Sequence, residues 1–261
     1  MNISFAGRIP TPSIGTIGME GEHNAETLYF RGLPEIDGGT AALNVVLPNG
    51  TADVLTITDG DIMVRTSGHN AEGIESKGTL TISGGDVLVS AYDDAINSSG
   101  DLTISDGYVL CVGTNNDGID TNGNFYIKGG TLIAMGASGA ETGIDIDEQH
   151  KFYISGGNFF GIGERIDGTI GSTTQGIVTT TGSVQANSTV TISSGSTSLA
   201  SFSMPPYSYN NGTIIVSAPG MTSGSSYTLS LGSSTLTVTA SNSINSGMGG
   251  MGGQPGGGWG R

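Results

Sequence analysis

Basic residues are scarce in this chain, in which Lys and Arg together number 8 of 261 residues against 23 Asp and Glu. The formal net charge is −15, and a nucleic-acid-binding surface needs a basic stripe, so no nucleic-acid partner is expected. No run of eighteen apolar residues occurs, so the sequence predicts no membrane insertion. Gly, Ser, Thr and Asn are abundant and are poor helix formers, which excludes a helical bundle.

Cysteine occurs once, as Cys111. A single cysteine forms neither an internal disulfide nor a multi-thiolate metal site, and we expect it to be a small buried side chain. The first ten residues lack the basic and apolar regions of a secretory signal. We expect an extracellular or cell-surface location reached after loss of a signal, or alternatively a place on a virion.

Glycine, by contrast, is abundant, with 46 residues, and it punctuates a phrase that recurs along the chain. The five copies span residues 55–64 (LTITDGDIMV), 80–89 (LTISGGDVLV), 102–111 (LTISDGYVLC), 125–134 (FYIKGGTLIA) and 152–161 (FYISGGNFFG). The isoleucine at the third position recurs at intervals of 25, 22, 23 and 27 residues. Repetition at this period is typical of a solenoid.

Each copy alternates apolar and polar residues around a Gly-Gly or Asp-Gly corner, as short strands joined by tight turns do. A repeat of this length fits either a leucine-rich repeat or one coil of a parallel β-helix. No stretch has the helical periodicity that a leucine-rich repeat needs. We therefore predict an all-β solenoid whose coils stack about 4.8 Å apart, with glycines at corners that require a positive φ or a close backbone approach.

Stacking converts equivalent positions of the repeat into columns of side chains. The predicted interior columns are Ile57, Ile82, Ile104, Ile127, Ile154; Leu55, Leu80, Leu102, Phe125, Phe152; Ile74, Ile96, Ile119, Ile144; Ile62, Val87, Val109, Leu132, Phe159; and Val64, Val89, Cys111, Ala134, Gly161. One outward column is wholly apolar and consists of Met63, Leu88, Leu110, Ile133 and Phe160. We expect the N-terminal segment or a C-terminal module to cover this column, and a ligand groove is the alternative.

The composition changes on both sides of the repeats, which occupy residues 51–165. Residues 1–50 do not repeat, contain two apolar segments at 27–30 and 42–47, and are predicted to form an N-terminal β cap or attachment segment. Residues 166–240 are rich in Ser, Thr and Gly and are predicted to form a small C-terminal β module. Residues 241–261 are rich in Gly and Met and are predicted to be a flexible tail.

A second recurring phrase is acidic: it reads AEGIE at residues 71–75, DDAIN at 93–97, NDGID at 116–120 and ETGID at 141–145. Between residues 72 and 148, thirteen acids face two bases. Parallel stacking brings like charges to about 5 Å, which is destabilising unless their pKa values rise or a cation binds. Oxygen ligands select Ca²⁺ over zinc or copper, so we predict calcium, the alternative being a solvated acidic face with its charges splayed apart.

The candidate calcium ligands are the acidic and amide side chains of this phrase and one nearby aspartate. They are Glu72, Glu75, Asp93, Asp94, Asn97, Asn116, Asp117, Asp120, Glu141, Asp145 and Asp147. A sugar-binding face needs aromatic side chains that stack on the rings, and the candidates are Tyr92, Tyr108, Tyr126 and Tyr153. Tyr126 and Tyr153 fall in one outward column and should lie one above the other. The alternative is that these tyrosines serve only the β propensity of their strands.

The phrases at residues 80–85, 93–96 and 116–119 resemble those of the clostridial-type carbohydrate-binding β-helix family, cell-surface proteins that bind cellulose and acidic plant polysaccharides. Residues 197–202, 214–219 and 224–228 look like the closing strands of that family, and a Gly/Met-rich tail recurs there too. The resemblance spans residues 55–240, whereas residues 1–50 differ from the family. It implies a right-handed parallel β-helix related in fold to polysaccharide lyases, with bound calcium ions and no catalysis.

The sequence therefore predicts calcium-dependent, non-catalytic binding of polysaccharide, with acidic plant or cell-wall glycans as the expected ligands. One alternative is a phage-tail or cell-surface adhesin in which the solenoid is a receptor-binding shaft, possible as a homo-oligomer. Another is a polysaccharide lyase, which needs a strong base such as Arg or Lys beside the acids. The three histidines, His23, His69 and His150, are scattered and have no identifiable nucleophile partner, which argues against a catalytic triad.

Overall fold

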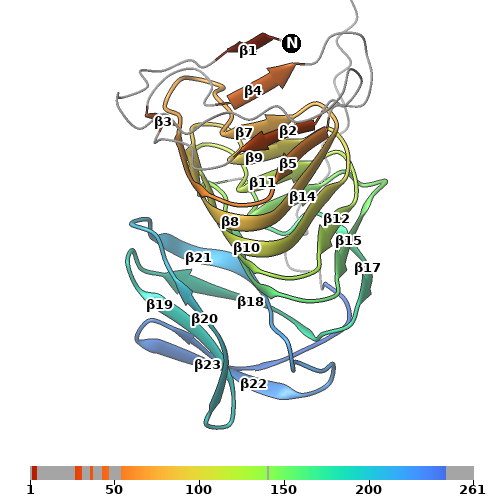
Figure 1. Cartoon of the computed structure of the whole chain (residues 1–261). Helices are drawn as coiled ribbons and strands as arrows, with labels where there is room; N and C mark the ends of the chain where they lie inside the picture. The colour runs from red at the N-terminus through yellow and green to blue at the C-terminus, as the bar shows by residue number, and fades with distance from the viewer. Residues whose placement is uncertain are drawn as a thin grey trace, which may run out of the picture.

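The computed structural model of the chain describes residues 2–4, 27–30, 36–37, 43–46, 54–139 and 141–244. Every regular element in these ranges is a strand. No helix long and apolar enough to cross a membrane is found among them. The coils stack in parallel as a β-solenoid that carries additional strands at its C-terminal end (Figure 1). The predicted all-β, parallel β-helical fold with a C-terminal β module is confirmed.

Three stacks of parallel strands form the sides of the solenoid. The first contains β2 (Thr27–Phe30), β5 (Val54–Ile57), the first parts of β8 (Thr79–Ala91) and β10 (Leu102–Gly113), β12 (Phe125–Ile127), β15 (Lys151–Ile154) and β17 (Thr169–Thr173). The second contains β3 (Ile36–Asp37), β6 (Asp61–Arg65), the second parts of β8 and β10, β13 (Thr131–Met135) and β16 (Asn158–Gly163). The third contains β4 (Leu43–Val46), β7 (Ile74–Ser76), β9 (Ile96–Ser98), β11 (Ile119–Thr121) and β14 (Ile144–Ile146), and β1 (Asn2–Ser4) pairs antiparallel with β4.

The pairing register follows the sequence repeat residue by residue. Ile57, Ile82, Ile104, Ile127 and Ile154 pair in that order and are at most 1% exposed. In the neighbouring column the rings of Phe125 and Phe152 stack with their centroids 5.0 Å apart and an interplanar angle of 14°. The core is therefore built from like side chains one coil apart, and the predicted interior columns are buried.

Glycines at the corner between the first two stacks have the backbone conformation expected for them. Gly60, Gly85, Gly107, Gly130 and Gly157 all have a positive φ, between 73° and 103°. A Cβ added at Gly107 would lie 2.6 Å from the carbonyl oxygen of Gly85 in the preceding coil. These corners thus require glycine both for φ and for the close approach of neighbouring coils.

The C-terminal strands extend the second stack and then fold back over it. Strand β21 (Tyr209–Ser217) pairs antiparallel with β16 and β18 (Ile177–Val184) pairs with β21. A four-stranded antiparallel sheet follows in the order β20 (Thr197–Ser203), β19 (Thr189–Ser194), β22 (Ser226–Leu231) and β23 (Ser234–Thr239). This sheet packs against the outer face of β13 and β16 and forms a second hydrophobic core with them.

This packing covers only part of the apolar outward column. Ile133 and Phe160 are fully buried in the second core, whereas Met63, Leu88 and Leu110 remain partly exposed. The C-terminal module therefore covers the lower coils, contacts Leu110 on β10, and leaves Met63 and Leu88 outside the second core. The domain boundaries at residues 50, 165 and 240 stay predictions. Most of the predicted flexible tail, from residue 245 on, lies outside the described residues.

Cys111 lies in an interior column and is fully buried, as its place in the repeat predicts. Burial raises the pKa of its thiol far above the ordinary value, so little thiolate forms at neutral pH. We expect the folded protein not to react with Ellman's reagent within minutes and the denatured protein to release one equivalent of chromophore. A rapid reaction of the native protein would contradict the buried position.

Candidate functional site

Three carboxylates lie two residues before the stacked isoleucines of β7, β9 and β11, and we call Glu72, Asp94 and Asp117 the first acidic ladder. Asp94 is 3% and Asp117 5% exposed. The backbone N–H of Asp117 donates a hydrogen bond to Asp94 Oδ1 at 3.0 Å. The backbone N–H and the hydroxyl of Thr142 both donate to Asp117 Oδ1. Each buried carboxylate is thus held by backbone from the next coil.

A second acidic ladder runs along the strands themselves and consists of Glu75, Asn97, Asp120 and Asp145, which pair in successive coils. The amide of Asn97 donates to Glu72 Oε1 and to Asp94 Oδ2, both at 3.3 Å, so it joins the two ladders. Near the top of the ladder, Lys77 Nζ donates to Glu75 Oε1. Parallel stacking therefore places two rows of acids and amides side by side.

The proximity of these groups shows in their pKa values. Burial, followed by the charge of Glu72, raises the pKa of Asp94 to about 8. Burial and the charge of Asp93 raise the pKa of Glu72 to about 7, and burial and Asp145 raise that of Asp117 to about 7. Burial and Asp145 also raise the pKa of Asp120 to about 6. The two ladders therefore hold more negative charge than this partly buried environment stabilises by itself.

The described residues form rows of acids rather than a closed metal cage. No three Asp, Glu, His or Cys side chains among them converge on one point. One carboxylate oxygen, Glu72 Oε2, is buried and has no hydrogen-bond partner. Buried acceptors without a partner are costly, and a cation is one way to satisfy them. The donor set of carboxylates, amides and backbone carbonyls consists of the oxygen ligands that Ca²⁺ takes.

The first acidic ladder ends in a cation that the sequence analysis did not identify. Arg165 forms a parallel bridge with Thr142, which in turn occupies the ladder position below Asp117. The guanidinium also pairs with Asp167. Arg165 follows Thr142 by 23 residues, one repeat length, so extending the repeat alignment by one coil could have found it.

The remaining calcium candidates lie around these ladders. Asn116 Nδ2 donates to Asp93 Oδ1 of the preceding coil at 2.8 Å. Burial is the main cause of the raised pKa values of Asp117 and Asp145, and the charge of Glu141 adds to both, so Glu141 is electrostatically part of the group. Asp147 lies in the turn after β14, where its Oδ1 accepts the backbone N–H of Gln149 at 2.9 Å. The eleven candidates thus lie along one side of the solenoid, with Asp147 at its margin.

The four candidate tyrosines do not form one surface. The rings of Tyr126 and Tyr153 stack on each other with centroids 4.9 Å apart and an angle of 11°. Lys128 Nζ lies 5.2 Å from the Tyr126 centroid, and a Cβ at Gly171 would lie 2.4 Å from Tyr153, so protein already contacts these rings. Tyr92 packs beside His69, with centroids 5.5 Å apart. Tyr108 lies on the outer face of β10 instead.

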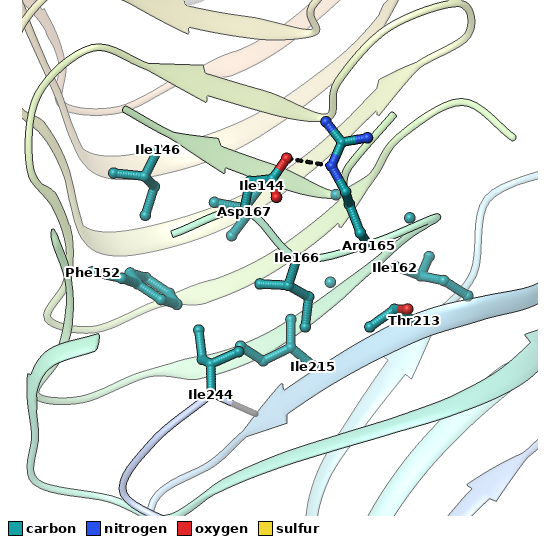
Figure 2. A pocket seen from close by; sticks show the side chains of 13 residues that line it. Ile144, Ile146, Phe152, Ile162, Arg165, Ile166, Asp167, Thr213, Ile215 and Ile244 are labelled. Carbon is teal, nitrogen blue, oxygen red and sulfur yellow. Dashed lines mark hydrogen bonds and ion pairs between the residues drawn. The ribbon is translucent and has the colours of Figure 1, made fainter. Parts of the chain in front are cut away.

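A small apolar pocket lies where the last coil meets the C-terminal strands (Figure 2). The side chains of Ile144, Phe152, Ile215 and Ile244 converge there, with the Arg165–Asp167 ion pair at one side. The lining is dominated by isoleucine and glycine. The pocket lies at the lower end of the core, and its lining offers few polar groups for a ligand.

The comparisons with known proteins give one match. The family described as carbohydrate-binding domain-containing protein matches residues 18–112, which is less than half of the chain. No curated protein and no solved structure matched the chain. The matched residues end within β10 and so contain the upper coils, the first two carboxylates of the first acidic ladder and Tyr108, but neither Tyr126 nor Tyr153. This match supports carbohydrate binding.

Proposed function

We propose that this protein binds polysaccharide without catalysis, outside the cell or on a surface, and that calcium held by the two acidic ladders supports the binding. The observation that carries the carbohydrate part is the family match over residues 18–112. The absence of catalysis is inferred from the arrangement of the ladders. Their acids are tied to neighbouring coils by hydrogen bonds, and the two bases beside the ladders, Lys77 and Arg165, are paired with Glu75 and Asp167.

The calcium part is supported by the state of the ladder carboxylates. Glu72, Asp94 and Asp117 have raised pKa values because burial and mutual repulsion disfavour their charged forms. The side chains that would hold the ion are these three together with Asn97 and Asp120. A bound Ca²⁺ would neutralise the repulsion and supply positive charge at the surface of the solenoid. The residues themselves position oxygen atoms in two parallel rows.

This arrangement also accounts for an acidic glycan as the proposed ligand. A surface with a strong negative charge repels uronates unless a cation lies between the two. Calcium on the ladders would bridge sugar carboxylates to protein carboxylates. Binding of such a glycan should therefore require the metal. The solenoid itself contributes only the regular spacing of the carboxylates in the ladders.

The test is retention of polygalacturonate by the full chain in native affinity gels, with calcium and with EDTA. We expect retardation in calcium and its loss in EDTA. Asp94→Asn keeps the size of the side chain but removes one charge, and we expect it to weaken the calcium-dependent retardation about tenfold. Asp106→Asn, on an exposed aspartate at the corner between the first two stacks, is the matched control and should behave as the wild type.

Two results would count against the proposal. Equal retardation in calcium and in EDTA would separate glycan binding from the metal. Unsaturated products after incubation with polygalacturonate, seen as ultraviolet absorbance, would identify the protein as a lyase.

A further inference from the structure

The outer face of the second strand stack changes character from the lower coils to the upper ones. At the bottom, Ile133, Met135 and Phe160 are buried beneath the C-terminal sheet. Val112 at the end of β10 belongs to the same core. One coil above Ile133, Leu110 is partly exposed but still packs against this core, and in the two coils above it Leu88 and Met63 are partly exposed and do not belong to it. The apolar outer face of the second strand stack therefore extends beyond the part that the C-terminal sheet buries.

The partly exposed region above the C-terminal sheet has an apolar centre, and we call it the upper outer face. Met63, Leu88 and Leu110 are direct register partners on β6, β8 and β10, so their side chains form one row across three coils. All three are partly exposed. A contiguous apolar row on the surface of a folded protein is a candidate contact surface, unlike apolar residues that are exposed singly.

Polar groups border this row along one edge. Asp61, Asp86 and Tyr108 pair in register next to the apolar row, and Asp61 and Asp86 are exposed. The same three side chains, with Asp59 and the corner glycines Gly60, Gly85 and Gly107, line an open depression. Burial, and then the charge of Asp86, raises the pKa of Tyr108, which is the register partner of Asp86.

An aromatic side chain from the C-terminal module closes the opposite edge. Tyr207 lies in the loop between β20 and β21, and its hydroxyl is 3.0 Å from Ser90 Oγ on β8. Its exposed fraction is 39%, and it is the one large hydrophobic side chain that is exposed among the described residues. The upper outer face therefore lies between a row of acids on one side and a tyrosine on the other.

This combination of groups fits one class of ligand. The faces of pyranose rings carry C–H groups that pack on apolar and aromatic side chains, and the ring edges carry hydroxyls that donate to carboxylates. Asp59, Asp61 and Asp86 would repel an anionic sugar, and this face is separate from the ladders where calcium is proposed. The charge on the rim therefore selects an uncharged glycan.

We infer that an uncharged polysaccharide binds across the upper outer face, with its ring faces on Met63, Leu88 and Leu110 and its hydroxyls on Asp61 and Asp86. This inference rests on the proposed carbohydrate binding, but it needs no calcium. The family match also covers all of these positions and ends at residue 112. Tyr108 and Tyr207 limit the face on its two sides.

The experiment is affinity gel electrophoresis of the full chain in galactomannan and in mixed-linkage β-glucan, both uncharged, in EDTA. We expect retardation by at least one of the two. Leu88→Gln and Tyr108→Ala should each raise the Kd at least about tenfold, as central interface side chains do. Thr81→Ala changes a half-buried outward side chain in the part of β8 that belongs to the first stack and is the control, expected to leave the Kd unchanged. Thermal melts verify that each variant is folded.

Asp86→Asn provides a second test if Leu88→Gln fails to fold, since the side chain is exposed, and it should also weaken binding. The inference is overturned if neither uncharged polysaccharide retards the wild type, or if the variants bind as it does. It is also overturned if Leu88→Gln converts a dimer into a monomer in gel filtration, because a second copy then occupies the face. Polygalacturonate gels in calcium report on the ladders separately, so failure here leaves that result intact.

Discussion

The melting temperature of the protein in EDTA should fall as the pH rises from 5 to 9, and calcium should restore it at the upper end. Asp94 has a pKa of about 8 in the folded chain, and those of Glu72 and Asp117 are about 7. In the unfolded chain these groups titrate near pH 4. The folded state therefore binds more protons between these limits, and its stability is lost as the pH passes through the folded-state pKa values. We expect a fall on the order of 5 to 10 °C.

Differential scanning fluorimetry across this range, with EDTA and with calcium, measures the effect. Asp94→Asn should flatten the EDTA curve, because an amide carries no proton to lose, and should reduce the gain from calcium. A metal-free melting temperature that rises with pH would contradict the raised pKa values. A melt that calcium leaves unchanged at pH 8 would contradict the metal and would leave a solvated acidic face as the explanation.

The stacking of the repeat could be predicted in detail because a solenoid has a simple rule of contact. Residues that occupy the same position of the repeat become neighbours, so the repeat alone places Ile74, Ile96, Ile119 and Ile144 in one column, as their pairing confirms. The same rule brought the acids into register. No comparable rule relates the solenoid to the module that follows it, because that packing depends on where the chain leaves the last coil.

The rest of the candidate site depends on such non-repeating contacts. Partial cover of the apolar column arises because the C-terminal sheet reaches Ile133 and Phe160 but not Leu88. The repeat predicts that Tyr126 and Tyr153 lie one above the other. Because they are one coil apart, their rings stack on each other, and the stacked faces are not available to a ligand. The spacing that makes a column predictable thus also limits what aromatic residues within it can bind.

The two proposed binding surfaces follow from this architecture. On the third strand stack, repetition concentrates like charges in two ladders, and their raised pKa values favour a cation. On the second strand stack, repetition builds an apolar row that the C-terminal module covers in part. One set of stacked coils can in this way present a metal-dependent surface and a metal-independent one, and a chelator distinguishes the two.

Both surfaces depend on corners that only glycine can form, so Gly107→Ala should be strongly destabilising. Gly107 has φ of 91°, and an added Cβ would lie 2.6 Å from the Gly85 oxygen and 2.8 Å from the Gly84 carbonyl carbon. The variant must tolerate the positive φ, at about 1–2 kcal/mol, and also push two coils apart. We expect a total loss of about 3 kcal/mol or more in the free energy of unfolding.

Gly224→Ala separates the two contributions. Gly224 has a similar φ of 83°, but an added Cβ would meet nothing within 4 Å. The control should therefore lose only the cost of the backbone conformation, about 1–2 kcal/mol. Urea denaturation of both variants, followed by circular dichroism, measures the difference. Equal losses in the free energy of unfolding would mean that the coils can move apart at the corner without further cost. The spacing of the coils, on which the acidic ladders and the apolar row both depend, would then not be set by these glycines.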